Sequence, residues 1–459
     1  MTTRYDAIIV GTGQAGPPLA GRLTKAGWRC AIVERGRFGG TCVNYGCTPT
    51  KTLVASARAA YMARRAADFG VAIEGPVRVD MARVKARKDA IAGRSNEGIT
   101  EFVKDMENAV VFEDHAVFEG DKRLRVGGET IEADRIFINV GARAAIPPIE
   151  GLDGVPYLTN ASILDLERLP DNLVILGGGY VGVEFGQMYQ RLGSAVTIVD
   201  RARRLMSSED EDVSAAIREI FENEAIEVIT GATIEAVARD GERLRVTLAE
   251  GEGRRTLAAS HFLVAAGRKP NTDDLGLETT GIETDDEGYI TVDDRLRTSV
   301  DGVYALGDCN GRGAFTHTSY NDYEILAANL LDGDDRRLSD RFTAYAAYID
   351  PPYARVGASA SELRAAGRKA LIAQMPMSGV ARARERSETE GFMKLLVDAH
   401  THEFLGAQMI GTGCDEVLHC ILYAMYAGAP YTAIERAVPI HPTVAELLPT
   451  MLKQLEPLD

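Results

Sequence analysis

The chain has 459 residues, of which 45% are hydrophobic and 26% charged, so it is long enough for several globular domains. Its formal net charge of −16 argues against nucleic acid or an anionic membrane as the main partner, because phosphate contacts need clustered Lys and Arg. Six cysteines are too few for an extracellular disulfide framework, and no apolar stretch reaches the roughly 20 residues of a membrane span, so we expect a cytoplasmic protein.

The N-terminal residues predict a βαβ unit of the kind that binds a dinucleotide. A strand at Tyr5–Val10 precedes a helix at Pro17–Ala26 and a second strand at Cys30–Val33, and the few residues before the unit leave no room for a signal peptide. The turn between strand and helix carries Gly11, Gly13 and Gly16. Glycines let the backbone approach a pyrophosphate at the helix N-terminus. Glu34, which closes the second strand, stands where a carboxylate accepts hydrogen bonds from a ribose.

Two cysteines follow this unit directly. Cys42 and Cys47 are separated by four residues in the run Gly39–Lys51, GGTCVNYGCTPTK, and a long helix is predicted at Pro49–Asp68. The two thiols can close a disulfide beside a cofactor, and such a pair can pass two electrons to a substrate. We expect both cysteines at a helix start, where the helix dipole lowers a thiol pKa and favours the reactive thiolate. The remaining cysteines are interpreted as small buried hydrophobic residues.

The same dinucleotide pattern recurs in the middle of the chain. A strand at Leu173–Leu176 precedes a helix that runs to Leu192, and a strand at Ala195–Val199 closes with Asp200. The turn of this second unit contains Gly177, Gly179 and Gly182. One chain with two such units binds two dinucleotides, or one dinucleotide and a related cofactor. The alternative is a duplicated unit that has lost the ability to bind a dinucleotide, but the glycines and the acidic residue are present in both copies.

Further elements complete the predicted order. Strands are expected within 109–132, and buried strands at 136–140, 262–266 and 303–306 end near Gly141, Gly267 and Asp308. From about residue 342 the pattern changes to an α+β domain, with a hairpin formed by 394–397 and 405–410 around His400 and His402. Alternating histidines at a turn usually face solvent, and no further ligands stand nearby, so we expect no metal site.

Six landmarks in this order resemble those of the flavoprotein pyridine nucleotide-disulfide oxidoreductases, which include glutathione reductase, dihydrolipoamide dehydrogenase and mercuric reductase. They are the first glycine turn, the cysteine run, the second glycine turn, Gly-Arg-Lys-Pro-Asn from Gly267, Ala-Leu-Gly-Asp ending at Asp308, and His-Pro-Thr-Val-Ala-Glu from His441. The resemblance covers Asp6 to about Leu452, nearly the whole chain. The cysteine run is its most specific part.

The resemblance implies an α/β fold with two Rossmann-like dinucleotide-binding domains, for FAD and NAD(P)H, and a C-terminal α+β dimerisation domain. The implied bounds are 1–148 and 273–341 for the two segments of the FAD domain, 149–272 for the NAD(P)H domain and 342–459 for the interface domain. FAD would contact Gly11, Gly13, Gly16, Glu34, Gly40, Thr41, Gly141 and Asp308. NAD(P)H would contact Gly177, Gly179, Tyr180, Gly182, Asp200, Arg201 and Gly267. For Asp308 the alternative is a helix N-cap.

Catalytic roles also follow from the resemblance. Electrons would pass from NAD(P)H through FAD to the cysteine pair, with Cys47 facing the flavin as a thiolate and Cys42 attacking the substrate. Lys51 resembles the family lysine near the flavin that pairs with a glutamate, here Glu184. The remaining implied residues are His441, the general acid/base supplied across a homodimer interface, Glu446, which orients it, and Tyr180, which resembles an aromatic gate over the nicotinamide pocket. Pro442 would begin a helix.

The acceptor and the preferred dinucleotide stay open. A disulfide, a quinone or a metal ion such as Cu(II) or Hg(II) could accept electrons. The residues of the cysteine run most closely resemble those of mercuric-reductase-like proteins, yet the chain has no second, C-terminal cysteine pair. Dihydrolipoamide dehydrogenase is the runner-up, and a flavin-bearing redox sensor is the alternative of another class. Asp200 favours NADH because a carboxylate repels a 2′-phosphate, whereas the following Arg201, Arg203 and Arg204 could attract one.

Overall fold

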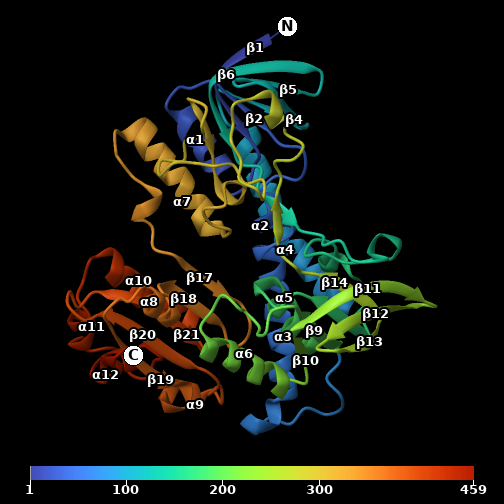
Figure 1. Cartoon of the computed structure of the whole chain (residues 1–459), viewed down its shortest axis with the longest axis vertical. Helices are drawn as coiled ribbons and strands as arrows, with labels where there is room; N and C mark the ends of the chain where they lie inside the picture. Colours follow the sequence, from blue (N-terminus) through green and yellow to red (C-terminus); the bar gives the residue numbers. More distant parts are fainter. Residues whose placement is uncertain (1) are drawn as a thin grey trace.

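A computed structural model describes residues 2–459, and its first sheet contains strands from two distant parts of the chain (Figure 1). The sheet order is β3-β2-β1-β6-β5-β4, and β16 also pairs with β6. The strands are β1 (Thr2–Val10), β2 (Cys30–Val33), β3 (Ala109–Phe112), β4 (Ala116–Gly120), β5 (Arg123–Val126), β6 (Glu129–Ile138) and β16 (Val303–Ala305). β1, β2, β3, β6 and β16 run parallel, so their carboxyl ends meet at one edge of the sheet. That edge is where such sheets bind ligands.

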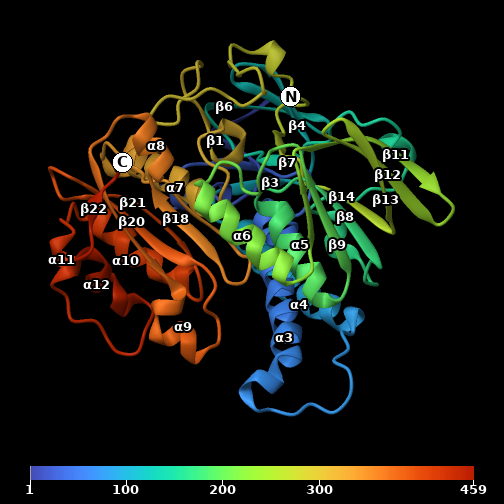
Figure 2. The same ribbon diagram turned by 60° about the horizontal axis from the view of Figure 1, so that its bottom comes forward.

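Helices cover this sheet and extend away from it. They are α1 (Gly16–Lys25), α2 (Gly40–Asn44), α3 (Cys47–Arg64), α4 (Met81–Lys104) and α7 (Thr316–Ala327). Buried Leu19 and Leu23 of α1 and Ile325 and Leu326 of α7 pack in one apolar cluster with the first sheet. α3 and α4 lie side by side and reach out of this layer toward the second sheet (Figure 2). α3 therefore connects the first layer with the second.

The second unit is a parallel sheet of order β10-β9-β8-β14. Its strands are β8 (Asn172–Leu176), β9 (Ala195–Asp200), β10 (Glu227–Thr230) and β14 (His261–Val264), with helices α5 (Tyr180–Leu192) and α6 (Glu211–Asn223). An antiparallel sheet of β11 (Ala232–Asp240), β12 (Arg243–Glu250) and β13 (Gly253–Ala259) follows. The chain leaves the first unit through β7 (Ala142–Ala144) and returns through β15 (Arg268–Pro270), and these two strands pair with each other.

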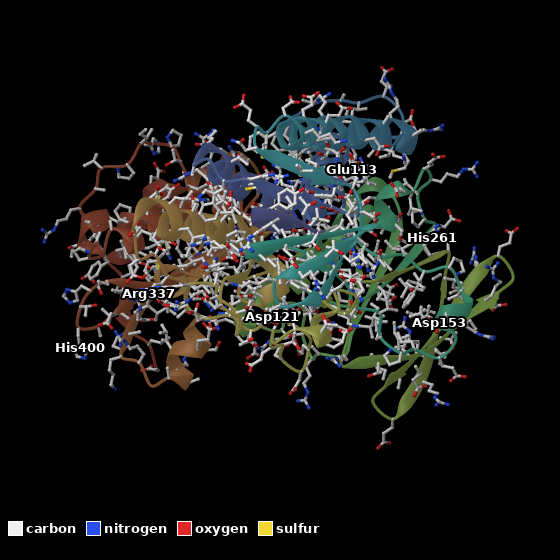
Figure 3. The ribbon with its side chains drawn as sticks, turned by 90° about the horizontal axis from the view of Figure 1, so that it is seen from above. Glu113, Asp121, Asp153, His261, Arg337 and His400 are labelled. Carbon is white, nitrogen blue, oxygen red and sulfur yellow. The ribbon has the colours of Figure 1, made fainter. Side chains whose placement is uncertain are left out.

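The C-terminal part is an antiparallel sheet of order β17-β18-β21-β20-β19-β22, covered by short helices. Its strands are β17 (Ala344–Ala347), β18 (Tyr353–Gly357), β19 (Ala370–Pro376), β20 (Phe392–Asp398), β21 (Phe404–Ile410) and β22 (Glu456–Pro457). Its helices are α8 (Ala360–Ala365), α9 (Ala381–Glu385), α10 (Cys414–Tyr426), α11 (Thr432–Glu435) and α12 (Leu448–Leu452). The predicted hairpin is present as β20 and β21, and His400 lies exposed at its turn, at the edge of the molecule (Figure 3).

Two predicted helix starts are wrong. Pro442 does not begin a helix, because the Thr443 hydroxyl accepts a hydrogen bond from the Glu446 amide and the 3-10 turn starts only at Ala445. Cys42 is the third residue of the short helix α2, so only Cys47, the first residue of α3, stands at a helix N-terminus. Within residues 2–459, none of the helices combines the length and the apolar character that a membrane crossing requires.

Candidate active site

A cavity of about 800 Å³ opens at the carboxyl edge of the first sheet and extends to the start of α5. It brings together predicted residues from the first and second units: Gly11, Gly13, Glu34, Gly40, Thr41, Cys42, Cys47, Lys51, Gly141, Tyr180, Glu184 and Asp308. Its volume lies within the range of small-molecule and cofactor pockets. The other predicted residues lie outside its walls: Gly16, Gly177, Gly179, Gly182, Asp200, Arg201, Gly267, His441 and Glu446.

The first glycine turn leaves no room for side chains. Gly11 has φ +102°, a left-handed conformation that favours glycine. A Cβ on Gly16 would lie 2.3 Å from the Gly11 carbonyl oxygen, and a Cβ on Gly40 would lie 2.8 Å from Gly13 Cα. Buried Asn139 locks this turn, since its Oδ1 accepts from the Gly16 amide at 3.1 Å and its Nδ2 donates to the Leu306 carbonyl at 3.1 Å. The backbone is therefore open toward the cavity.

Glu34 is held at the carboxyl end of β2 by its neighbours. Its Oε2 accepts from the Thr12 amide at 2.9 Å and the Thr12 hydroxyl at 2.6 Å, and its Oε1 accepts from the Gly36 amide at 2.8 Å. These bonds orient the carboxylate at the cavity wall before any ligand arrives. A carboxylate has about four acceptor positions, so it can still receive hydrogen bonds from ribose hydroxyls.

Asp308 lies half-buried in the cavity wall, beside Arg268. Burial raises the pKa of the Asp308 carboxyl, and Arg268, whose Nη2 lies 2.8 Å from Asp308 Oδ2, opposes that increase. The N-cap alternative for Asp308 is wrong, because the helical turn Gly307–Asn310 is capped by Leu306 and contains Asp308. Arg268 also donates to the Ala142 carbonyl at 2.7 Å, and its buried Nε has no partner within residues 2–459.

The two cysteines are free thiols, and their pKa values are shifted in opposite directions. A hydrogen bond from Cys42, then the Thr316 hydroxyl and the Lys51 charge, lower the pKa of Cys47 to about 6, although burial opposes them. The same bond to Cys47 and burial raise the pKa of Cys42. Thr316 Oγ1, at the first residue of α7, lies 3.3 Å from Cys47 Sγ. The surroundings therefore favour a thiolate on Cys47 over one on Cys42.

Lys51 and Glu184 form the ion pair expected between them. Lys51 Nζ lies 2.6 Å from Glu184 Oε2, and the side chains are 32% and 9% exposed. The other carboxylate oxygen accepts from the Tyr348 amide at 2.8 Å, and the Lys51 ammonium lies 4.7 Å from the centroid of the Tyr348 ring. Glu184 is thus fully paired, and the ammonium is positioned at the cavity wall one helical turn from Cys47.

His441 and Glu446 form a second pair, away from this chain's own cavity. His441 Nδ1 lies 2.9 Å from Glu446 Oε2, and the histidine side chain is 76% exposed. The neighbouring Val438 and Ile440 are 97% and 79% exposed. Glu446 orients the imidazole and leaves its Nε2 on the open side of the ring. Apolar side chains this exposed indicate a surface that another chain covers.

The second glycine turn repeats the geometry of the first. Gly177 has φ +112°, and a Cβ on Gly182 would lie 1.8 Å from the Gly177 carbonyl oxygen. A Cβ on Gly179 would meet no atom within 4 Å, so the backbone there faces open space. Asp200 accepts from the Ala202 amide at 2.7 Å and from the Gly178 amide, which fixes its carboxylate beside the turn.

The arginines after Asp200 differ from one another. Arg201 and Arg203 are exposed. Arg204 points back into the protein, where its Nη2 donates to the Ser207 and Glu209 carbonyls at 3.3 and 3.2 Å. Arg204 is therefore occupied in holding its own loop, and two arginines remain at the surface beside the Asp200 carboxylate.

Comparison with known proteins identifies the family. The family model described as pyridine nucleotide-disulphide oxidoreductase matches residues 5–322, and the dimerisation domain of the same family matches residues 343–452. The chain belongs to the pyridine nucleotide-disulfide oxidoreductases. The order of the glycine turns, the cysteine run and the C-terminal sheet along the chain is thus that of this family. The predicted family and fold class are confirmed.

Relatives within the family carry different names. The chain is 34% identical over 453 residues to a probable pyridine nucleotide-disulfide oxidoreductase, RclA, of Escherichia coli, across 97% of this chain and 98% of that protein. It is 35% identical to a mercuric reductase of Streptomyces lividans, across 97% and 95%. It is 31% identical to dihydrolipoyl dehydrogenase 2 of Haloarcula marismortui, across 97% and 95%. A solved Cu(II) complex of the HOCl-induced flavoprotein disulfide reductase RclA matches with a TM-score of 0.90 at 33% identity, over 98% and 99% of the chains.

Membership of the family confirms the predicted cofactors and enzyme class: the chain is an FAD-dependent NAD(P)H oxidoreductase of the disulfide-reductase type. The cavity fits FAD. Glycines clear the backbone for a phosphate, Glu34 presents a fixed carboxylate for a ribose, and the unpartnered Nε of Arg268 supplies a buried donor to a ligand. The residues that would hold the cofactor line one continuous cavity with both cysteines.

Three residues of this site were missed from the sequence. Asn139 directly follows β6, Arg268 stood only within a landmark run, and Thr316 belonged to none of the predicted motifs. Each makes its contact across a long distance in sequence: Asn139 with Gly16, Arg268 with Asp308, and Thr316 with Cys47. A polar residue directly after a buried strand, as at Asn139, is the one local signal that could have identified any of them.

Proposed function

We propose that this enzyme reduces a disulfide bond of a small acceptor with the dithiol of Cys42 and Cys47. The observation that supports this most strongly is the pairing of a Cys47 thiol of low pKa with a Cys42 thiol of raised pKa in one cavity wall. FAD, when bound, takes a hydride from NAD(P)H and supplies two electrons to the cysteine pair. The individual roles of the two cysteines are part of this proposal.

The thiol chemistry balances with two electrons from the cysteine pair, one proton from Cys42 and one proton from solvent. The Cys42 sulfur, after loss of its proton to a base, attacks one sulfur of the acceptor; an S–S bond breaks, and one thiol leaves. The Cys47 thiolate then attacks the Cys42 sulfur of the mixed disulfide and releases the second half of the acceptor as a thiolate, which takes a proton from solvent. The acceptor therefore gains two electrons from the pair, which becomes a disulfide, and two protons, one from Cys42 and one from solvent. His441, held by Glu446 at 2.9 Å, would take the proton of Cys42 and give it to the leaving thiolate.

His441 must then come from a second copy of the chain. It does not line its own cavity, and Val438 and Ile440 beside it are almost fully exposed. The dimerisation domain supports a homodimer, and we propose that each active site draws on both subunits. Mixing inactive Cys42→Ser subunits with inactive His441→Gln subunits tests this proposal, because one site of the mixed dimer keeps both native residues and should recover turnover.

The acceptor itself can be tested by one substitution. Cys42→Ser should abolish NADH-dependent reduction of oxidised glutathione and of an aromatic disulfide, while NADH still bleaches the flavin absorbance. Undiminished disulfide turnover in this variant would contradict the thiol mechanism. The matched control is Cys420→Ser. Cys420 lies on α10 outside the cavity and is exposed, so its interpretation as a buried hydrophobic residue is wrong.

A metal ion is the second candidate acceptor. Two neighbouring thiols are soft ligands of the kind that Cu and Hg prefer. The solved structure similar to this chain is described as a Cu(II) complex, and another relative as a mercuric reductase. Formation of Cu(I), followed with a Cu(I)-specific dye at saturating NADH, would support this candidate if it also requires Cys42.

We propose NADH as the preferred dinucleotide and Tyr180 as the cover of the nicotinamide position. The Asp200 carboxylate is fixed by the Gly178 and Ala202 amides, and Arg204 is occupied within its loop. Tyr180 lines the cavity beside Lys51 and Glu184. The ratio of kcat/KM for NADH and NADPH tests the preference, and Asp200→Ser should shift that ratio toward NADPH.

The domain division proposed for these roles follows the sheets. Residues 1–148 and 273–341 would form the FAD-binding domain, 149–272 the NAD(P)H-binding domain and 342–459 the interface domain. The pairing of β16 with β6 supports a split first domain, because it returns the chain to the first sheet after the second unit. Limited proteolysis with and without NADH, which should protect only the second unit, tests the bounds.

A further inference from the structure

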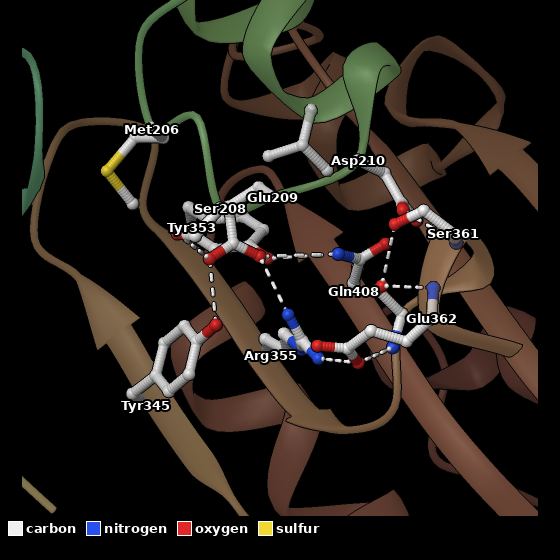
Figure 4. A network of polar contacts seen from close by, with 12 residues as sticks. Met206, Ser208, Glu209, Asp210, Tyr345, Tyr353, Arg355, Ser361, Glu362 and Gln408 are labelled. Carbon is white, nitrogen blue, oxygen red and sulfur yellow. Dashed lines mark hydrogen bonds and ion pairs between the residues drawn. The ribbon is translucent and has the colours of Figure 1, made fainter. Parts of the chain in front are cut away.

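The most densely bonded side chain outside the thiol site is the carboxylate of Glu209, in the loop between β9 and α6. Its side chain has no exposed surface. Oε1 accepts from the hydroxyls of Tyr345 and Tyr180 at 2.7 and 3.1 Å, and Oε2 accepts from Tyr353 at 2.5 Å. Arg355 and Gln408 donate to Oε2 at 3.4 and 3.3 Å, and the Ser208 hydroxyl donates to Oε1 at 3.4 Å (Figure 4).

The three phenols act as donors in this cluster. Burial and the Glu209 charge raise the pKa of Tyr345 to about 12, and the same two causes raise the pKa of Tyr180 and Tyr353. All three hydroxyls therefore keep their protons at any physiological pH. Hydrogen bonds to a carboxylate are about twice as strong as those between neutral groups, so each ring is held firmly at its hydroxyl end.

Two of these rings belong to the C-terminal sheet, but Tyr180 belongs to the dinucleotide unit. It begins α5 directly after the second glycine turn, and its ring lines the cavity. It stands edge-on to Phe315 and Tyr345, with centroids at 5.8 and 5.4 Å. A ring packed on its sides and bonded at its hydroxyl has one defined position in the cavity wall.

The loop that contains Glu209 also contacts the second glycine turn of the dinucleotide unit. The Met206 amide donates to the Gly178 carbonyl at 2.8 Å, and Arg204 donates to the Glu209 carbonyl at 3.2 Å. Residues 200–209 thus run from the Asp200 carboxylate, past the glycine turn, to the hydroxyl of Tyr180. The Glu209 carboxylate therefore belongs to the same short segment as Asp200, the residue that we expect to contact the adenosine ribose of the dinucleotide.

We propose that Glu209 is the positioning residue of Tyr180: its hydrogen bond holds the ring over the nicotinamide position and sets the free energy that the dinucleotide must supply to displace it. This inference rests on the proposed place of Tyr180 over the nicotinamide. A binding-competent state that is only partly populated lowers the apparent affinity by that fraction. Weakening the bond between Tyr180 and Glu209 should therefore tighten dinucleotide binding.

The test uses the holoenzyme and tetrahydro-NAD, an NADH analogue that carries no transferable hydride, with its Kd measured by calorimetry. Tyr180→Phe keeps the ring and removes the bond, so the Kd should fall about tenfold. Glu209→Gln should lower the Kd less, because its amide can still accept at one atom. In the Tyr180→Phe background, Glu209→Gln should change the Kd no further, which marks a shared interaction.

Tyr189→Phe is the matched control, because Tyr189 lies on the same helix α5 and its buried hydroxyl donates to the Ile163 carbonyl at 2.8 Å. It should lower the melting temperature but leave the Kd unchanged. The inference is overturned if Tyr180→Phe leaves the Kd unchanged or raises it, or if the effects of Tyr180→Phe and Glu209→Gln simply add. Since no turnover is measured, failure of the thiol mechanism in the Cys42→Ser test would leave this result unaffected.

Discussion

Replacing Thr316 with valine should make the Cys47 thiol less acidic without changing the shape of the site. Valine is nearly isosteric with threonine but has no hydroxyl, and the Thr316 hydroxyl oxygen lies 3.3 Å from Cys47 Sγ. The bond from Cys42 is the largest cause that lowers the pKa of Cys47, to about 6, and Thr316 and Lys51 add to it. The substitution therefore removes the contribution of Thr316 to the lowered pKa of Cys47 and leaves those of Cys42 and Lys51.

The size of the effect follows from that one contact. A hydrogen bond to a charged group contributes about 1.5–3 kcal/mol, and the lower value applies here because Cys47 borders an open cavity. A free-energy difference of about 1.4 kcal/mol corresponds to a tenfold change in an acid dissociation constant. We therefore expect Cys47 in Thr316→Val to lose its proton about one pH unit higher than in the native enzyme.

The assay is an anaerobic pH titration of the two-electron-reduced holoenzyme, following the long-wavelength absorbance that a thiolate gives beside an oxidised flavin. The thiolate is the form above the pKa, so this absorbance grows as pH rises through the pKa, and the midpoint should lie higher in the variant. Thr52→Val is the control, because the Thr52 hydroxyl bonds the Thr48 carbonyl at 2.7 Å and no sulfur. Equal midpoints in Thr316→Val and the native enzyme would refute the reasoning.

Three further substitutions test other parts of the site. Gly16→Ala places a Cβ 2.3 Å from the Gly11 carbonyl oxygen, so the variant should lose about 1–3 kcal/mol of stability and purify with less FAD, as the ratio of flavin to protein absorbance will show. Glu184→Gln leaves the partly exposed Lys51 ammonium without its partner, so urea unfolding should show a loss of about 1–2 kcal/mol, between the values for exposed and buried pairs. His441→Gln should lower disulfide turnover at least about 100-fold but leave the rate of flavin reduction by NADH unchanged in stopped-flow mixing.

The glycine turns were predictable from the sequence because their requirements are local. Gly11 and Gly177 need a left-handed backbone, and Gly16 and Gly182 need contact with the carbonyl five residues before them. All of these constraints act within a few residues of chain, so the spacing of the glycines records them. The strands on either side follow from short apolar runs, and both βαβ units lie where the sequence placed them.

The residues whose contacts join distant parts of the chain could not be found in this way. Thr316 is 269 residues from Cys47, and Asn139 is 123 residues from Gly16. Neither contact leaves a repeating pattern in the sequence, and the one local signal, a polar residue directly after the buried strand β6, marks only Asn139. The cysteine run predicted the two thiols that we propose to react, whereas part of the acidity of Cys47 comes from Thr316 at the start of α7, a helix that follows the strand β16 paired with β6.

Glu209 shows why a buried charge is harder to foresee than a reactive one. In the sequence it stands in Ser207-Ser208-Glu209-Asp210, a polar stretch that is typical of an exposed loop. Its burial comes from β17 and β18, which face the loop with Tyr345, Tyr353 and Arg355. A carboxylate can be buried there only because donors from a distant strand pair replace water at both oxygens. If Tyr180 covers the nicotinamide position as we propose, the C-terminal sheet helps to fix it there, and we expect a substitution in that sheet to alter dinucleotide binding without touching the nucleotide unit.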